Sequence, residues 1–300
     1  MDTPRKGTPA VMKLAQARTD EQSPFDVADL PPLSVTANRL LALLSDPDLD
    51  ICDLAGVIEQ DPPLAARIIG LANAAYFSPR TPVVNVHQAI LRVLGLNLVR
   101  NLALSMVVAG SFDPRRCPGF DLKRYWFEAL AVAMASHTVA LRSPATQRPA
   151  PDLYYLGGLL HNLGLLFLAH VKPQDTAAVL ARKREQPDAS IVDLFREAVD
   201  TTPGEAGVWL ATRWSLPASV VQIMSAVESA KVSGDYRSPA AVVRAAIRLA
   251  RTCSADDCPL PEKPEGYLLG LGLDCRVAEA VEEDFLQRCP ELRALASLVA

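Results

Sequence analysis

Residues 58–77 read IEQDPPLAARIIGLANAAYF and carry signals for both ends of a helix. Asp61 is a residue type that accepts hydrogen bonds from free backbone N–H groups at a helix start, and the two prolines after it suit a first helical turn. Apolar residues then recur at helical spacing at Leu64, Ile68 and Leu71. We expect a helix that begins after Asp61, with Asn73 satisfying backbone groups at its end.

Helix starts of this kind recur along the chain. They combine a capping side chain with a proline or with an acidic or amide residue at capping-box spacing. They lie at Asn85, Thr202 and Ser238, and Asp274 is expected to cap a further helix. Sustained alternation of polar and apolar residues, which indicates strands, is scarce, and residues 82–86 come nearest to it. The sequence therefore predicts an all-α protein.

The segments between these helices predict how the chain is organised. Residues 113–119, with two prolines, indicate a connector between two helical halves, and Gly95 indicates a corner between two helices. Polar, proline-containing stretches at 143–151 and 253–264 predict loops. Residues 1–23 predict a disordered N-terminal tail.

Composition narrows the classes of function. Half of the 300 residues are apolar and 21% are charged, as in a globular protein. The net charge of −4 argues against nucleic acid as a partner, because nucleic-acid binders normally present a basic face. The first 24 residues lack the apolar core of a secretory signal, and the six scattered cysteines suggest reduced thiols. We therefore expect a cytoplasmic protein.

The longest apolar stretch, residues 154–171, is long enough to raise the question of a membrane span. It contains His161, Asn162 and His170, with two glycines before the first histidine. These residues favour a buried core helix, without membrane insertion. The three tryptophans are expected to anchor the core, at Trp126, Trp209 and Trp214.

Several segments of the chain resemble the HDOD domain family. In the first half these are LPPL at 30–33, LLALL at 40–44, IEQDP at 58–62, LANAAYF at 71–77 and AILRVLG at 89–95. Further on, GLLHNLG at 158–164 and RWSLP at 213–217 resemble segments that HDOD domains share with catalytic HD phosphohydrolases. The resemblance implies two packed helical subdomains, 24–115 and 116–300, the second an HD-like helical bundle. It also implies a regulatory role in bacterial signalling.

The resemblance also locates the metal site of the catalytic relatives. An HD phosphohydrolase holds a divalent metal between histidines and carboxylates, and the metal polarises a phosphoryl oxygen and activates water. Glu128 stands where the family has its first histidine, and the HD pair is His161-Asn162. An amide oxygen lacks the negative charge that makes aspartate a strong ligand.

Two further ligand positions also differ from the catalytic pattern. Pro203 stands where binuclear relatives have a histidine, and their paired histidines correspond to Val227 and Glu228. The remaining histidines are expected on other helix faces or in the other subdomain, at His87, His137 and His170. We therefore expect no catalytic residue, no bound metal and no cofactor, only vestigial positions at His161, Asn162 and Glu128.

The leading hypothesis is a non-enzymatic regulatory and protein-interaction module. Its partners, by resemblance, would be a response regulator, a histidine kinase or a cyclic-di-GMP enzyme. One alternative is a sensor that binds a nucleotide in the vestigial HD pocket without hydrolysis, and another is a metal-dependent phosphodiesterase. In the leading hypothesis His161 is a buried side chain that bonds to a neighbouring helix, as does Asn162; in the sensor hypothesis His161 contacts the ligand.

Overall fold

The computed structural model describes residues 24–300 except 45, 47, 144–149, 229–236 and 254–263. Every regular element within these residues is helical, and none is a strand. The predicted all-α class is therefore confirmed. The predicted disordered tail, 1–23, lies outside the described residues, and the boundary between residues 115 and 116 stays a prediction.

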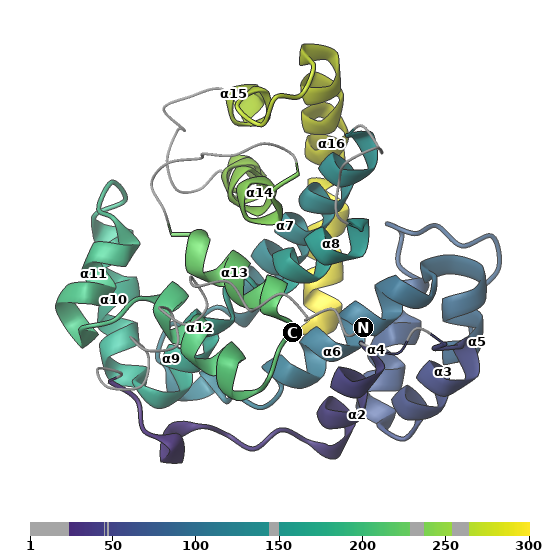
Figure 1. The fold of residues 1–300 in the computed structure, drawn as a ribbon, viewed down its shortest axis with the longest axis horizontal. Coiled ribbons are helices and arrows are strands. Elements are labelled where there is room, and N and C mark those ends of the chain that lie inside the picture. Colours follow the sequence, from purple (N-terminus) through teal and green to yellow (C-terminus); the bar gives the residue numbers. More distant parts are fainter. Residues whose placement is uncertain (1–23, 45, 47, 144–149, 229–236, 254–263) are drawn as a thin grey trace, which may run out of the picture.

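The N-terminal helices lie on the right in Figure 1. A short 3-10 helix, η1, precedes them, and a π-helical segment, η2, interrupts them. Their bounds are η1 (Val27–Asp29), α2 (Val35–Leu43), α3 (Ile51–Glu59), α4 (Pro62–Ala72), α5 (Val86–Gln88), η2 (Ala89–Leu94) and α6 (Leu96–Ala109). The Asp61 carboxylate accepts a hydrogen bond from Leu64 N at 3.1 Å and begins α4 as predicted.

Asn73 ends α4 and also ties the next segment to it. Its side-chain amide donates to Ile69 O at 3.1 Å and to Val83 O at 2.8 Å, and its Oδ1 accepts from Val83 N at 2.8 Å. The predicted role at the helix end is confirmed, and the bonds to Val83 hold an extended segment against α4. Gly95 adopts φ +80° between η2 and α6, which confirms the predicted corner.

The later helices form the left and centre of Figure 1. A 3-10 turn, η3 (Pro114–Arg116), lies in the predicted connector. The helices are α7 (Leu122–Arg142), α8 (Pro151–Leu160), α9 (Leu163–Val171), α10 (Pro173–Glu185), α11 (Ile191–Val199), α12 (Pro203–Arg213), α13 (Ala218–Ala226), α14 (Pro239–Cys253), α15 (Pro264–Leu269) and α16 (Cys275–Val299). The loops predicted at 143–151 and 253–264 fall mostly outside the described residues.

Local helix signals were reliable guides to these boundaries. The predicted caps accept backbone hydrogen bonds at Asn85, Thr202, Ser238 and Asp274. The predicted core anchors are buried at Trp126, Trp209 and Trp214. Phe25 packs against Phe167 and Trp209, with ring centroids 5.0 and 5.3 Å apart, so the start of the described chain lies across the later helices.

Residues 154–171 do not form the single core helix that the sequence predicts. Helix α8 ends at Leu160 and α9 begins at Leu163, with a turn at His161 and Asn162. By length and composition alone the helical stretch Pro151–Val171 could cross a membrane, but 78% of its apolar window is buried inside the protein. The turn corrects the predicted single helix and places His161 and Asn162 between α8 and α9.

The expectation of six reduced cysteines is also corrected. Cys253 at the end of α14 pairs with Cys289 in α16 as a disulfide, with Cα atoms 6.2 Å apart. Sequence spacing gave no sign of this pair, because 36 residues separate the two cysteines and only the packing of α14 on α16 brings them together. Cys52 and Cys117 are free thiols, and Cys258 lies outside the described residues.

Candidate functional site

The predicted site residues come from four elements of the helical bundle. Glu128 lies on α7, His161 and Asn162 form the turn between α8 and α9, Pro203 begins α12, and Glu228 follows α13. Helices α7 and α8 pack closely together, as do α9 and α12 and also α12 and α13. The fold therefore brings these elements together as neighbouring pairs.

His161 is buried, with 9% of its surface exposed, and its Nδ1 lies 2.7 Å from Gly158 O. Burial lowers the pKa of His161 to about 4, although the Gly158 hydrogen bond acts in the opposite direction. The ring is therefore neutral at neutral pH, and Nδ1 carries the proton because a carbonyl oxygen only accepts. This bond stays within α8, so the predicted bond to a neighbouring helix is wrong.

Asn162 is half-buried and has a backbone role in the turn. Its carbonyl accepts from Leu165 N at 3.1 Å, but its side chain has no hydrogen-bond partner among the described residues. The prediction that this side-chain amide bonds to a neighbouring helix is therefore wrong as well. In a catalytic HD pair the charged aspartate would stand here.

Glu128 forms an ion pair on its own helix. Arg124 Nε lies 3.4 Å from its Oε1, and a third of the Glu128 side chain is exposed. Burial raises the pKa of Glu128, while the positive charges of Arg124 and Arg251 lower it. Arg251 on α14 also lowers the pKa of His161, so a positive charge lies near both vestigial positions.

Pro203 lies where α9 and α12 meet. A Cβ atom at Gly164 would lie 1.9 Å from Pro203 O and 2.4 Å from Gly207 N. Only glycine at position 164 allows the two helix starts to approach this closely. Pro203 itself is buried and supplies no donor atom from its side chain.

The carboxylate of Glu228 caps helix α12. Its Oε1 accepts from Gly204 N at 2.5 Å, and the Thr202 hydroxyl also bonds to it. Thr202 Oγ1 in turn accepts from Glu205 N at 3.2 Å, so both polar side chains satisfy the free N–H groups of this helix start. Burial raises the pKa of Glu228, although these hydrogen bonds lower it.

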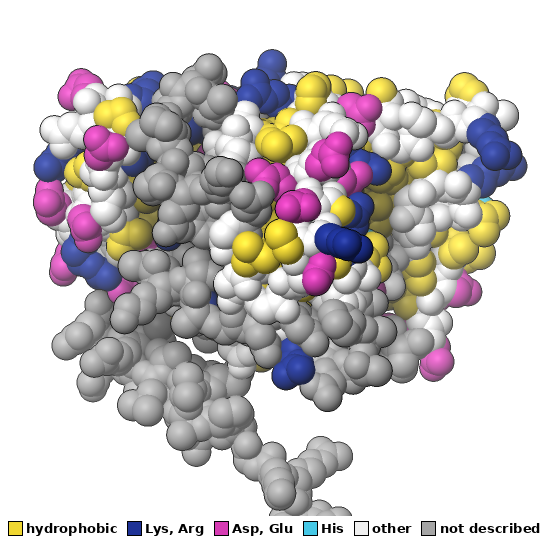
Figure 2. Space-filling view, turned by 90° about the horizontal axis from the view of Figure 1, so that it is seen from above, with side chains coloured by type: hydrophobic (Ala, Val, Ile, Leu, Met, Phe, Trp, Pro, Cys, Tyr) yellow, Lys and Arg dark blue, Asp and Glu magenta, His cyan; other side chains and the backbone are white. Residues whose placement is uncertain are grey.

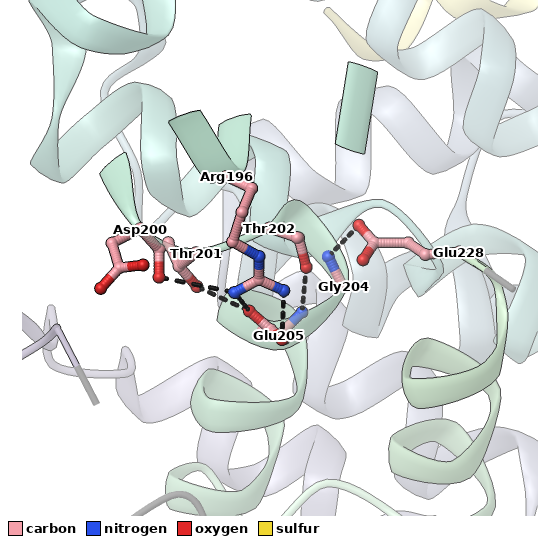
Figure 3. A network of polar contacts seen from close by, with 7 residues as sticks. All are labelled: Arg196, Asp200, Thr201, Thr202, Gly204, Glu205 and Glu228. Atoms are coloured by element: carbon pink, nitrogen blue, oxygen red, sulfur yellow. Dashed lines mark hydrogen bonds and ion pairs between the residues drawn. The ribbon is translucent and has the colours of Figure 1, made fainter. Parts of the chain in front are cut away.

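A second carboxylate reinforces the same helix start from the solvent side (Figure 3). Glu205 forms a bidentate pair with Arg196 of α11, with N–O distances of 2.7 and 2.6 Å. Thr201 Oγ1 also donates to Glu205 at 3.3 Å, and Asp200 turns the chain with φ +56°. Figure 3 shows Glu228 approaching Gly204 from the opposite side to Arg196. Both acidic residues thus have structural partners.

The other histidines have separate surroundings. His170 Nδ1 accepts from Asp113 N at 3.1 Å, the His137 ring lies 6.0 Å from that of Tyr155, and His87 is exposed on α5. Nowhere in the described part of the chain do three or more histidine, cysteine or acidic residues cluster so that they could hold a metal ion.

Sequence reasoning missed the cap that Glu228 provides and the charge of Arg251. The sequence offered one signal for this cap, the glycine at position 204 directly after Pro203. The structure shows why glycine stands there, because a Cβ atom would lie 2.6 Å from the Glu228 carboxyl carbon. The site therefore offers one neutral imidazole, one amide, the Glu128 carboxylate paired with Arg124 and the nearby charge of Arg251. This set can donate to or accept from a ligand, but among the described residues no three histidine, cysteine or acidic side chains lie together as a metal ion would need.

Comparison with known proteins identifies a family that this chain matches. The model of the HDOD domain family matches residues 30–230. A curated protein of Treponema pallidum (strain Nichols), itself uncharacterised, is 27% identical over 202 residues, which are 65% of this chain and 37% of that protein. This chain therefore spans little more than a third of that relative.

Solved structures give the same fold. A protein of Marinobacter aquaeolei VT8, assigned to signal transduction, is 26% identical with a TM-score of 0.79, covering 96% of this chain and 64% of that chain. An HDOD domain protein of unknown function from Geobacter sulfurreducens is 21% identical with a TM-score of 0.70, covering 96% and 98%. The predicted pair of helical subdomains, the second an HD-like bundle, is confirmed.

Proposed function

Because this chain belongs to the HDOD domain family, we propose that it is a non-enzymatic regulatory and protein-interaction module of bacterial signal transduction. The similarity to a protein assigned to signal transduction supports the signalling context. Its partners would be response regulators, histidine kinases or cyclic-di-GMP enzymes, and its compartment the cytoplasm.

One observation carries the non-enzymatic part of the proposal. Glu228 stands where catalytic relatives have ligand histidines, and its carboxylate is bonded to Gly204 N and to the Thr202 hydroxyl. Turning this carboxylate toward a metal would leave a buried helix start without its cap. Pro203 offers no donor atom in its place, and Asn162 offers no charge.

Hydrolysis by a restored variant tests this proposal. Asn162→Asp returns the charged half of the HD pair, but Glu128, Pro203 and Glu228 remain as they are. We expect neither this variant nor the wild type to hydrolyse a cyclic dinucleotide in the presence of manganese. Turnover by the variant above the wild-type background would contradict the proposal, because it would mean that the other ligands are present.

The interaction role requires a partner. Isolation of complexes from the native cell extract, followed by identification of bound proteins, should recover a signalling protein. The same proteins should be recovered by the Asn162→Asp variant, since the proposed interaction needs no catalysis. Recovery of nucleic acid or of a metabolic enzyme in place of a signalling protein would contradict the proposed role.

A nucleotide sensor in the vestigial pocket is the second candidate, and two observations favour it. Neither His161 Nε2 nor the Asn162 amide has a hydrogen-bond partner among the described residues, and the positive charge of Arg251 lies near His161. If the chain is a sensor of this kind, the His161→Ala variant should stay fully folded and lose its response to the ligand.

A further inference from the structure

A cavity lies in the N-terminal subdomain, on other elements than those that form the vestigial HD site. It has a volume of about 370 Å³ and is formed by the turn after α4 together with the π-helical segment η2. Its lining residues are Phe77, Ser78, Pro79, Arg80, Thr81, Arg92 and Val93. This volume is within the range of small-molecule sites, roughly 300–1,000 Å³.

The two arginines of this cavity have no ion-pair partner in the part of the chain that the structure describes. Within the described residues, neither Arg80 nor Arg92 makes a hydrogen bond, an ion pair or a ring contact. Both arginines line the same cavity, so it presents two positive charges although the whole chain carries a net charge of −4. Figure 2 shows basic side chains beside hydrophobic ones at its right edge, the end of the molecule where α5 lies in Figure 1.

The backbone on both sides of the cavity departs from regular geometry. Ser78 adopts φ +42°, a left-handed conformation that is rare for a residue with a side chain. The turn is held by Ser78 N to Ala74 O at 3.2 Å and by the Ser78 hydroxyl, which donates to Ala75 O. Arg92 lies in the π-helical η2, and such segments often mark functional positions.

The aromatic wall of the cavity is braced from the far end of the chain. The Phe77 ring meets the Tyr76 ring edge to face, with centroids 4.9 Å apart. The guanidinium carbon of Arg288, on α16, lies 5.2 Å from the centre of the Tyr76 ring, and Arg288 Nε lies 3.2 Å from Asp284 Oδ1. The wall is therefore fixed before any ligand arrives, which lowers the entropic cost of binding.

We propose that this cavity binds a nucleotide, with its phosphate between Arg80 and Arg92 and its ring or sugar against Phe77 and Val93. Guanidinium groups form paired hydrogen bonds with phosphate oxygens, and Thr81 adds a hydroxyl beside them. The site is separate from the vestigial HD pocket, so it does not depend on His161 or on the function proposed above. The competing occupant is an acidic protein segment, because Val84 and Leu91 nearby in sequence are 71% and 61% exposed.

Calorimetric titration with defined probes tests the proposal. The probes are ATP and GTP, adenosine and guanosine, inorganic phosphate, and a polyglutamate peptide. We expect at least one nucleotide to bind with a submillimolar Kd, and its nucleoside and phosphate alone to bind at least about tenfold more weakly. Raising the salt concentration should weaken nucleotide binding.

Matched variants test whether the nucleotide binds in this cavity. Arg80→Gln and Arg92→Gln should each weaken nucleotide binding at least about tenfold without changing the melting temperature, because both side chains are exposed. Arg276→Gln on α16, the same change at another exposed arginine, should leave the affinity unchanged. The proposal fails if neither nucleotide binds, if polyglutamate binds instead, or if the two cavity variants bind as well as Arg276→Gln.

Discussion

At the scale of single residues, we expect His161 to contribute to the stability of the bundle. Its Nδ1–H donates to Gly158 O and its ring is buried in the bundle. His161→Ala removes this bond and leaves a cavity, so we expect a loss of stability of about 1–3 kcal/mol for the unpaired group alone. Chemical denaturation measures it, with His87→Ala at an exposed position as the control. An unfolding curve equal to that of the wild type would contradict the structural role.

The pH dependence of stability gives a second test of the same residue. Because burial lowers the pKa of His161 to about 4, the unfolded chain binds one more proton than the folded chain between this value and about 6.5. His161 therefore stabilises the fold fully above pH 6.5, and roughly 3 kcal/mol is lost as the pH falls toward 4. The raised pKa values of Glu128 and Glu228 act in the opposite direction.

Comparing variants separates the contribution of His161 to the pH dependence of stability from the contributions of Glu128 and Glu228. The free energy of unfolding should fall less steeply between pH 7 and pH 4.5 for His161→Gln than for the wild type. His87→Gln serves as the control and should keep the wild-type slope. Parallel curves for wild type and His161→Gln would mean that His161 titrates normally in the folded protein.

At the scale of elements, the contact between α9 and α12 depends on a single glycine. A methyl group at Gly164 would lie 1.9 Å from Pro203 O, so Gly164→Ala must push the two helix starts apart. We expect a loss of about 3 kcal/mol or more, at the upper end of overpacking costs. Gly56→Ala in α3 has nothing within 4 Å and should stabilise by about 0.5–1 kcal/mol. Thermal denaturation compares the two, and similar melting temperatures would contradict this packing.

Elements were predictable from sequence wherever their signals are local. The cap at Asp61, the cap at Thr202 and the corner at Gly95 each depend on a few adjacent residues, and each was found where expected. The break between α8 and α9 was missed, because apolar periodicity continues through His161 and Asn162. The π-helical η2 was missed for the same reason, since its apolar pattern does not distinguish it from an α-helix.

At the scale of the whole molecule, contacts between distant segments were beyond the reach of the sequence. The pairing of Cys253 with Cys289 and the cap from Glu228 to Gly204 depend on how helices pack, not on spacing along the chain. The same packing joins the two subdomains, because α16 lies against both α7 and α4. The family resemblance indicated where catalytic relatives hold their ligands, but it could not show that Glu228 caps α12.

The metal content of the natively purified protein tests the central claim most directly. Elemental analysis for iron, manganese and zinc should find none of them at one equivalent per chain, because the Asn162 amide lacks the charge of an aspartate, Pro203 has no side-chain donor atom and the Glu228 carboxylate already bonds to Gly204 N. The same measurement on His161→Ala provides the reference. One equivalent of iron or manganese in the wild type that disappears in His161→Ala would contradict the account.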